Sequence, residues 1–71
     1  MFKLLTEKEQ IRYIRKKEIK NVELLEILIN SKSWKVRNEM VYQKSLTEKQ
    51  KEKLLNDEHY IVVESAKKEF L

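Results

Sequence analysis

Hydrophobic residues recur at helical spacing in short segments of the chain, and polar residues separate these segments. In the first segment, Thr6 and Glu9 have the spacing of a capping box, which predicts a helix over residues 7–17. Ile11 and Ile14 lie about one turn apart and mark a narrow buried stripe. The pattern therefore predicts an amphipathic helix with much of its surface in solvent.

The second and third segments differ in how much of the helix surface is apolar. Asn21 is suited to be an N-cap, and residues 22–30 after it are hydrophobic around most of the circumference, which predicts a widely covered central helix. Ser33 is suited to the same role, and the apolar positions of residues 34–44 fall in two groups. That spread suits a helix in contact with two neighbours.

The last two segments predict a mostly polar helix followed by an amphipathic one. Thr47 opens a second capping-box pattern, ahead of a helix over residues 48–55. Asp57 is expected to cap a helix over residues 58–70. Because the linkers are short, consecutive helices should be antiparallel neighbours. The hydrophobic pattern thus predicts an all-α fold of about five helices.

Two stretches of the chain match each other at an offset of 26 residues. Residues 28–38 align with residues 54–64, and the positions that pack or turn are alike while most others are solvent types. Repeats of this length mark stacked supersecondary units. The matched positions form the predicted repeat core, which consists of Leu28, Trp34, Val36, Met40, Leu54, Tyr60, Val62 and Ala66.

The matching stretches resemble HEAT-like repeats, whose pattern is Leu-(x)2-Asp-(x)4-Val-Arg-(x)2-Ala. The resemblance covers residues 22–71 and is carried by Leu28, Val36, Arg37 and Met40 in the first copy and by Leu54, Asp57, Val62 and Ala66 in the second. It implies a short right-handed α-solenoid used as a binding scaffold, usually for protein. Relatives similar to alkylpurine glycosylases bind DNA with a longer concave array.

We therefore expect a single helical-repeat domain over residues 1–71. Its parts would be a basic leading helix in residues 1–20, a first repeat in residues 21–46 and a second repeat in residues 47–71. No capping helix follows the second repeat, so apolar surface should be exposed at that end. This C-terminal end surface would consist of Ile61, Phe70 and Leu71.

Each copy departs from the family pattern at one polar position. The first copy keeps Arg37 but has Asn30-Ser31 where the acidic turn residue belongs, and the second keeps Asp57 but has Val63 in place of the arginine. In the family, these two residue types form a ladder between adjacent repeats. The resemblance therefore leads to the hypothesis that Arg37 pairs with Asp57.

Composition narrows the classes of protein that remain. The 71 residues include no glycine, proline or cysteine. An all-helical chain can dispense with glycine and proline, whereas sheet proteins normally need them at turns. The absence of cysteine excludes disulfides, thiolate metal sites and cysteine nucleophiles. Because no apolar run is long enough for a membrane span or a signal peptide, we expect a cytoplasmic protein without membrane contact.

The formal net charge of +4 is concentrated at the start of the chain. Residues 1–20 carry all of it, because residues 21–71 hold nine basic and nine acidic side chains. A solvated lysine-rich helix face is the plain interpretation. The functional one is a surface that attracts an acidic protein or a phosphate backbone. The candidate partner-binding residues, here called the basic arc, are Lys8, Arg12, Arg15, Lys16, Lys17 and Lys20.

Neither Trp34 nor the single histidine predicts an active site. Trp34 matches Tyr60 at the repeat offset, which favours packing between helices. His59 lacks the three or four convergent ligands of a metal site, and the oriented partner and nucleophile that a general base requires. Without glycine, a phosphate-cradling loop is also excluded. We expect no catalytic, cofactor-binding or metal-binding residue, and no enzyme.

These features favour a non-enzymatic interaction module that binds another protein, or a second copy of itself. It would present the basic arc beside apolar surface of the stack, so that charge steers the partner and apolar contact holds it. The alternative is an accessory protein that binds nucleic acid non-specifically through the basic arc, with an affinity that falls steeply with salt. Sequence-specific reading of DNA is not expected, since no helix-turn-helix pattern is present.

Overall fold

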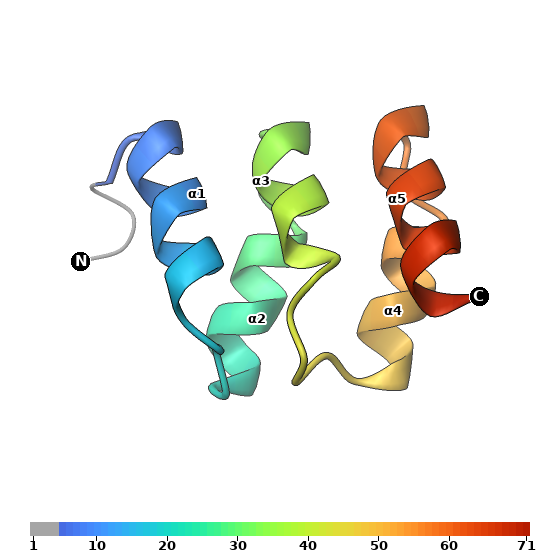
Figure 1. The fold of residues 1–71 in the computed structure, drawn as a ribbon, viewed down its shortest axis with the longest axis horizontal. Coiled ribbons are helices and arrows are strands. Elements are labelled where there is room, and N and C mark those ends of the chain that lie inside the picture. The colour runs from blue at the N-terminus through green and yellow to red at the C-terminus, as the bar shows by residue number, and fades with distance from the viewer. Residues whose placement is uncertain (1–4) are drawn as a thin grey trace.

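A computed structural model describes residues 5–71, and these residues form five helices and no strand (Figure 1). The expectation of an all-helical fold is confirmed for this part of the chain. The helices are α1 (Glu7–Lys16), α2 (Val22–Ile29), α3 (Trp34–Met40), α4 (Glu48–Leu55) and α5 (Tyr60–Phe70).

The helices are arranged in two rows. Helices α1, α3 and α5 stand side by side along the longest axis of the molecule, and α2 and α4 form the second row (Figure 1). Within the first row α3 packs against both α1 and α5, while α2 packs against α3 and α4, and α4 against α5. Helices α1 and α5 therefore form opposite ends of a molecule that measures 32 × 22 × 17 Å.

Four of the five predicted N-caps are present. The Thr6 hydroxyl accepts from the Glu9 amide at 3.2 Å, and Thr47 closes the second capping box in the same way. Asn21 and Ser33 cap α2 and α3. The prediction that Asp57 caps the last helix is wrong. Asp57 accepts instead from the amide of His59, whose Nδ1 caps α5, so this helix begins at Tyr60 rather than at residue 58.

Helix α3 ends at Met40, four residues earlier than predicted, and the buried side chain of Gln43 accounts for the difference. Its Oε1 accepts from the backbone amide of Ile19 at 2.8 Å. Its Nε2 donates to the carbonyls of Ile14 at 2.8 Å and Lys17 at 2.9 Å. A longer helix would carry this amide away from three backbone groups that need partners at the end of α1.

The turns before α3 and α5 have the same hydrogen-bonding pattern. The side-chain amide of Asn30 donates to the carbonyl four residues earlier at 2.8 Å, and Asn56 does the same at 2.9 Å. The amide of Ser33 donates to the side chain of Ser31, as the amide of His59 does to Asp57. The offset of 26 residues is therefore a repeat of local structure as well as of sequence.

Most of the predicted repeat core lies in the interior. Leu28, Val36, Met40, Leu54, Val62 and Ala66 are buried in one hydrophobic cluster. Trp34 is partly buried, and its ring stacks on the His59 ring with centroids 4.2 Å apart. The placement of Tyr60 in the core is wrong, because this residue is 74% exposed. Tyr60 begins the last helix of its row, so no described helix follows to cover it.

Arg37 and Asp57 form a buried two-point ion pair, as the repeat pattern suggested. Arg37 Nε lies 2.8 Å from Asp57 Oδ2, and Nη2 lies 3.1 Å from Oδ1. The side chains are only 10% and 7% exposed. Nη1 donates to the Ser31 carbonyl at 2.6 Å, so the guanidinium joins the turn before α3 to the turn before α5.

Glu26 links the two helices of the second row. Its carboxylate accepts from Gln50 Nε2 at 3.2 Å and Asn30 Nδ2 at 3.1 Å, and it lies 3.7 Å from Lys53 Nζ. The hydrogen bond from Gln50, then that from Asn30, and the charge of Lys53 hold the pKa of Glu26 below its ordinary value. The carboxylate therefore stabilises the folded state when it is ionised.

Breaking the buried ion pair should be costly and non-additive. We expect Arg37→Ala and Asp57→Ala each to lower the free energy of unfolding by about 3 kcal/mol, because each leaves a buried charge without its partner. The double variant should lose less than the sum, which gives a coupling energy of about 2 kcal/mol in a double-mutant cycle measured by urea unfolding. Additive losses would contradict a direct interaction.

Matched aromatic positions should respond differently to truncation. Trp34→Ala removes packing between α3 and α5 and should lower the free energy of unfolding by about 3 kcal/mol. Tyr60→Ala removes a mainly solvent-facing ring and should cost less than about 1 kcal/mol. Thermal or urea unfolding of the two variants measures this difference, and equal losses would show that Tyr60 is packed in solution.

The lowered pKa of Glu26 predicts a loss of stability in acid. A carboxylate whose pKa is lower in the folded state contributes stability above its unfolded pKa of about 4.5, and this contribution disappears as the pH falls through the folded pKa. Between pH 6 and pH 3, Glu26→Gln should therefore lose less stability than the wild type. Glu23→Gln on the same helix is the control and should follow the wild-type profile in urea unfolding.

Candidate partner-binding surface

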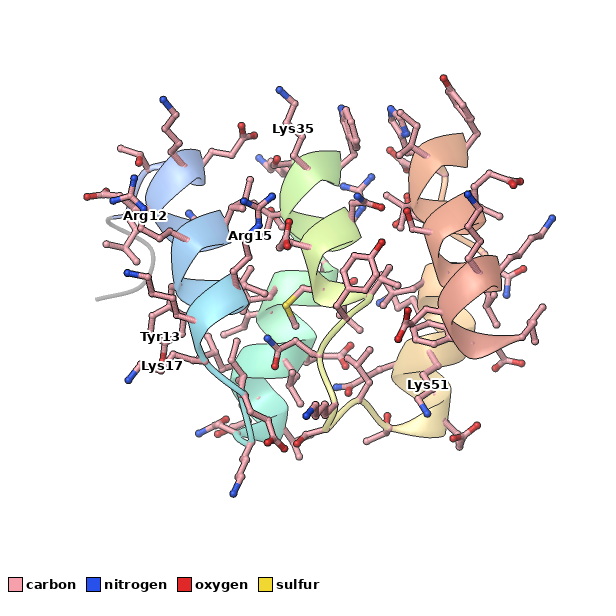
Figure 2. The ribbon with its side chains drawn as sticks, in the orientation of Figure 1. Arg12, Tyr13, Arg15, Lys17, Lys35 and Lys51 are labelled. Carbon is pink, nitrogen blue, oxygen red and sulfur yellow. The ribbon has the colours of Figure 1, made fainter. Side chains whose placement is uncertain are left out.

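All six residues of the basic arc are exposed, but they do not form one continuous surface. Figure 2 shows Arg12 and Lys17 on the side of α1 that faces away from α3, whereas Arg15 lies between α1 and α3. Arg15 Nε donates to Glu39 Oε1 at 2.9 Å and so joins the two helices. Within residues 5–71, the other five members of the arc make no ion pair.

The cations on the outer side of α1 surround an apolar hollow of about 230 Å³, here called the α1 hollow. Leu5 and the ring of Tyr13, which is 36% exposed, supply its aromatic and aliphatic surface. The aliphatic stems of long basic side chains commonly cover such apolar surface while their charged ends stay in water. The residues that line the hollow are Leu5, Glu9, Arg12, Tyr13, Lys16 and Lys17.

Helical spacing brings these side chains together. Lys16 and Lys17 follow Tyr13 by three and four residues, so they lie over the next turn on the same side of the helix. Glu9 precedes Tyr13 by four residues, but its carboxylate accepts the Thr6 amide at 2.9 Å. That backbone hydrogen bond lowers the pKa of Glu9. The single acidic group at the hollow is thus engaged in the helix cap.

The C-terminal end surface lies at the opposite end of the molecule from the basic arc (Figure 1). Ile61 and Phe70 are partly buried, and Leu71 is 88% exposed. Lys51 Nζ lies 5.8 Å from the centroid of the Phe70 ring and partly covers it (Figure 2). These residues cannot form one contact surface with the basic arc. The apolar groups beside that arc are Leu5 and Tyr13, which sequence reasoning did not assign to a site.

His59 has a structural position. Its Nδ1 accepts from the amide of Ile61 at 3.2 Å, and its ring lies nearly parallel to those of Trp34 and Tyr60. Among residues 5–71, no group of three or more metal-ligating side chains could hold a metal ion. The histidine therefore fixes the start of α5 and the contact between α3 and α5.

Comparison of the chain with protein-family models, curated proteins and solved structures finds no match. None of the described helices is long and apolar enough to cross a membrane.

Proposed function

We propose that the chain is a non-enzymatic, HEAT-like helical-repeat module that binds another protein through the outer side of α1. The fold supporting this proposal would be a short right-handed α-solenoid of antiparallel helices. Three observations support that assignment: the two rows of helices, the matching turns before α3 and α5, and the buried pair between Arg37 and Asp57. Such stacks serve mainly as scaffolds that display a binding surface.

The observation that carries the proposal is the combination of unpaired cations with an apolar hollow on one side of α1. Arg12, Lys16 and Lys17 form no ion pair within the described chain, and together with Glu9 they surround Tyr13. Positive charge accelerates the approach of an acidic partner, and desolvated aromatic contact then slows its dissociation. A lysine-rich helix face that only contacts solvent would need no exposed apolar surface among its cations.

Non-specific binding of nucleic acid is the alternative, and the charge distribution favours it less. A phosphate backbone needs cations that continue along the molecule. Arg15 is already paired with Glu39, and Lys67 on α5 lies 4.0 Å from Glu64. Residues 21–71 carry nine basic and nine acidic side chains, so the excess of positive charge is confined to one end, which suits a compact acidic contact better than an extended strand.

Affinity capture from cells that contain the natural partners tests the proposed function. The bait proteins are the wild type, Arg12→Glu/Lys16→Glu, and the control Lys49→Glu/Lys68→Glu, which changes the net charge equally at the other end of the molecule. After nuclease treatment and a wash in about 0.3 M salt, which screens exposed charges strongly, the wild type and the control should retain the same protein. The α1 variant should lose at least nine-tenths of it.

Two results would contradict the proposal. Capture that disappears with nuclease would identify a nucleic-acid complex. Equal capture by all three baits would show that α1 is not the binding surface.

A further inference from the structure

We infer that the partner contacts α1 with an acidic amphipathic helix, which lies beside α1 as α3 does on its other side. This inference rests on the proposed function, because it concerns the same surface and specifies the structural element that binds there.

The inner side of α1 shows how this helix accepts a neighbour. Helix α3 packs beside it, with the Arg15 guanidinium bonded to the Glu39 carboxylate at 2.9 Å. At the start of the helices, the Ser33 hydroxyl donates to the Glu7 carboxylate. Apolar packing and charge-assisted hydrogen bonds thus act together where a helix lies against α1. The outer side offers the same kinds of groups.

The spacing on the outer side matches a second helix. Arg12 and Lys16 are four residues apart, so they project from successive turns about 6 Å apart along the axis. Carboxylates four residues apart on a partner helix have the same separation. Next to these two cations, Tyr13 and Leu5 present apolar surface. An apolar side chain one turn away from the partner's carboxylates would pack against it. A helix therefore meets the cations and the α1 hollow simultaneously.

Position in the row explains why no described helix covers this side. Trp34, in the middle helix, is covered by the next helix through His59, whereas the matched Tyr60 at the end of the row is 74% exposed. Helix α1 is the other end of the row (Figure 1). With ten residues it is about 15 Å long, so the partner needs only about three helical turns.

A second copy of this chain fits the surface less well. Two α1 surfaces facing each other would bring unpaired cations together. At the opposite end, the hollow of about 470 Å³ next to Phe70 is lined by Glu48, Lys49, Lys51 and Glu52, whose charges cancel. Neither end therefore supplies the excess of carboxylates that the α1 surface lacks. A different protein with an acidic helix supplies it.

The test uses synthetic peptides of about 15 residues, the length at which an isolated helix begins to be populated in water. One peptide carries glutamate and leucine on one helical face, and a scrambled isomer has the same composition without that face. We expect the patterned peptide to bind the full chain at least five-fold more tightly, in NMR titrations at about 0.15 M salt. Its amide shifts should centre on Arg12, Tyr13 and Lys16.

Variants separate the role of the hollow from that of charge. Tyr13→Ala should weaken binding of the patterned peptide at least three-fold, whereas Tyr60→Ala, which truncates an exposed tyrosine at the other end, should leave it unchanged. Equal affinity for both peptides, or shifts centred away from α1, would overturn the helix inference. The same holds if an oligothymidylate of about 15 nucleotides binds more tightly, or if the chain self-associates through α1 in sedimentation equilibrium.

Failure of the helix inference can be distinguished from failure of the proposed function. If the scrambled and patterned peptides bind alike while affinity capture still depends on Arg12 and Lys16, a protein partner is retained but its element is not a helix. If capture is also independent of these residues, the proposed function itself is wrong.

Discussion

The buried ion pair between Arg37 and Asp57 is the interaction on which the alignment of the two repeats depends. Asp57 accepts both the guanidinium and the His59 amide, so one carboxylate fixes the start of α5 and its distance from α3. Burying two charges is costly, and only well-placed hydrogen bonds offset that cost. Here the Ser31 carbonyl takes a third guanidinium donor. Such a pair adds little net stability compared with an apolar contact. Its hydrogen bonds can form, however, in only one register of the turn before α3 against the turn before α5.

That register determines which aromatic side chains are covered. The amide of His59 is held by Asp57, and the His59 ring, which caps α5, then lies against Trp34. Tyr60 occupies the matched position one repeat later, but no described helix follows it in the row. The same sequence position is therefore structural within the row and exposed at its end, because burial depends on a neighbour and not on residue type. By this reasoning the outer side of α1 is the equivalent position at the other end, which no described helix covers.

Local signals in the sequence predicted more than non-local ones did. Four N-caps and the repeat offset follow from residue types at fixed spacing, and the pairing of Arg37 with Asp57 was implied by the resemblance to HEAT-like repeats. The early end of α3 could not be predicted, because it depends on Gln43 meeting the end of α1, twenty-nine residues away from Ile14 in sequence. The division of the basic arc also depends on a contact between residues that are distant in the sequence. Arg15 bonds to Glu39 of α3 and is thereby separated from Arg12. Leu5 was missed because it precedes the first predicted helix.

The cations on α1 that form no ion pair lower the stability of this helix, and that loss supports a role for them in binding. Arg12 and Lys16 are four residues apart on one helix, and like charges at this spacing destabilise a helix by roughly 0.2–0.5 kcal/mol. Lys16 lies in the last turn, where the helix dipole stabilises a positive charge and offsets part of this destabilisation. Arg12 lies in the middle of the helix, where the dipole stabilises it less. Arg15 by contrast is paired with Glu39, and Lys53 lies near Glu26. An acidic helix bound beside α1 would offset the repulsion between Arg12 and Lys16. Relief of that repulsion would contribute to the free energy of binding.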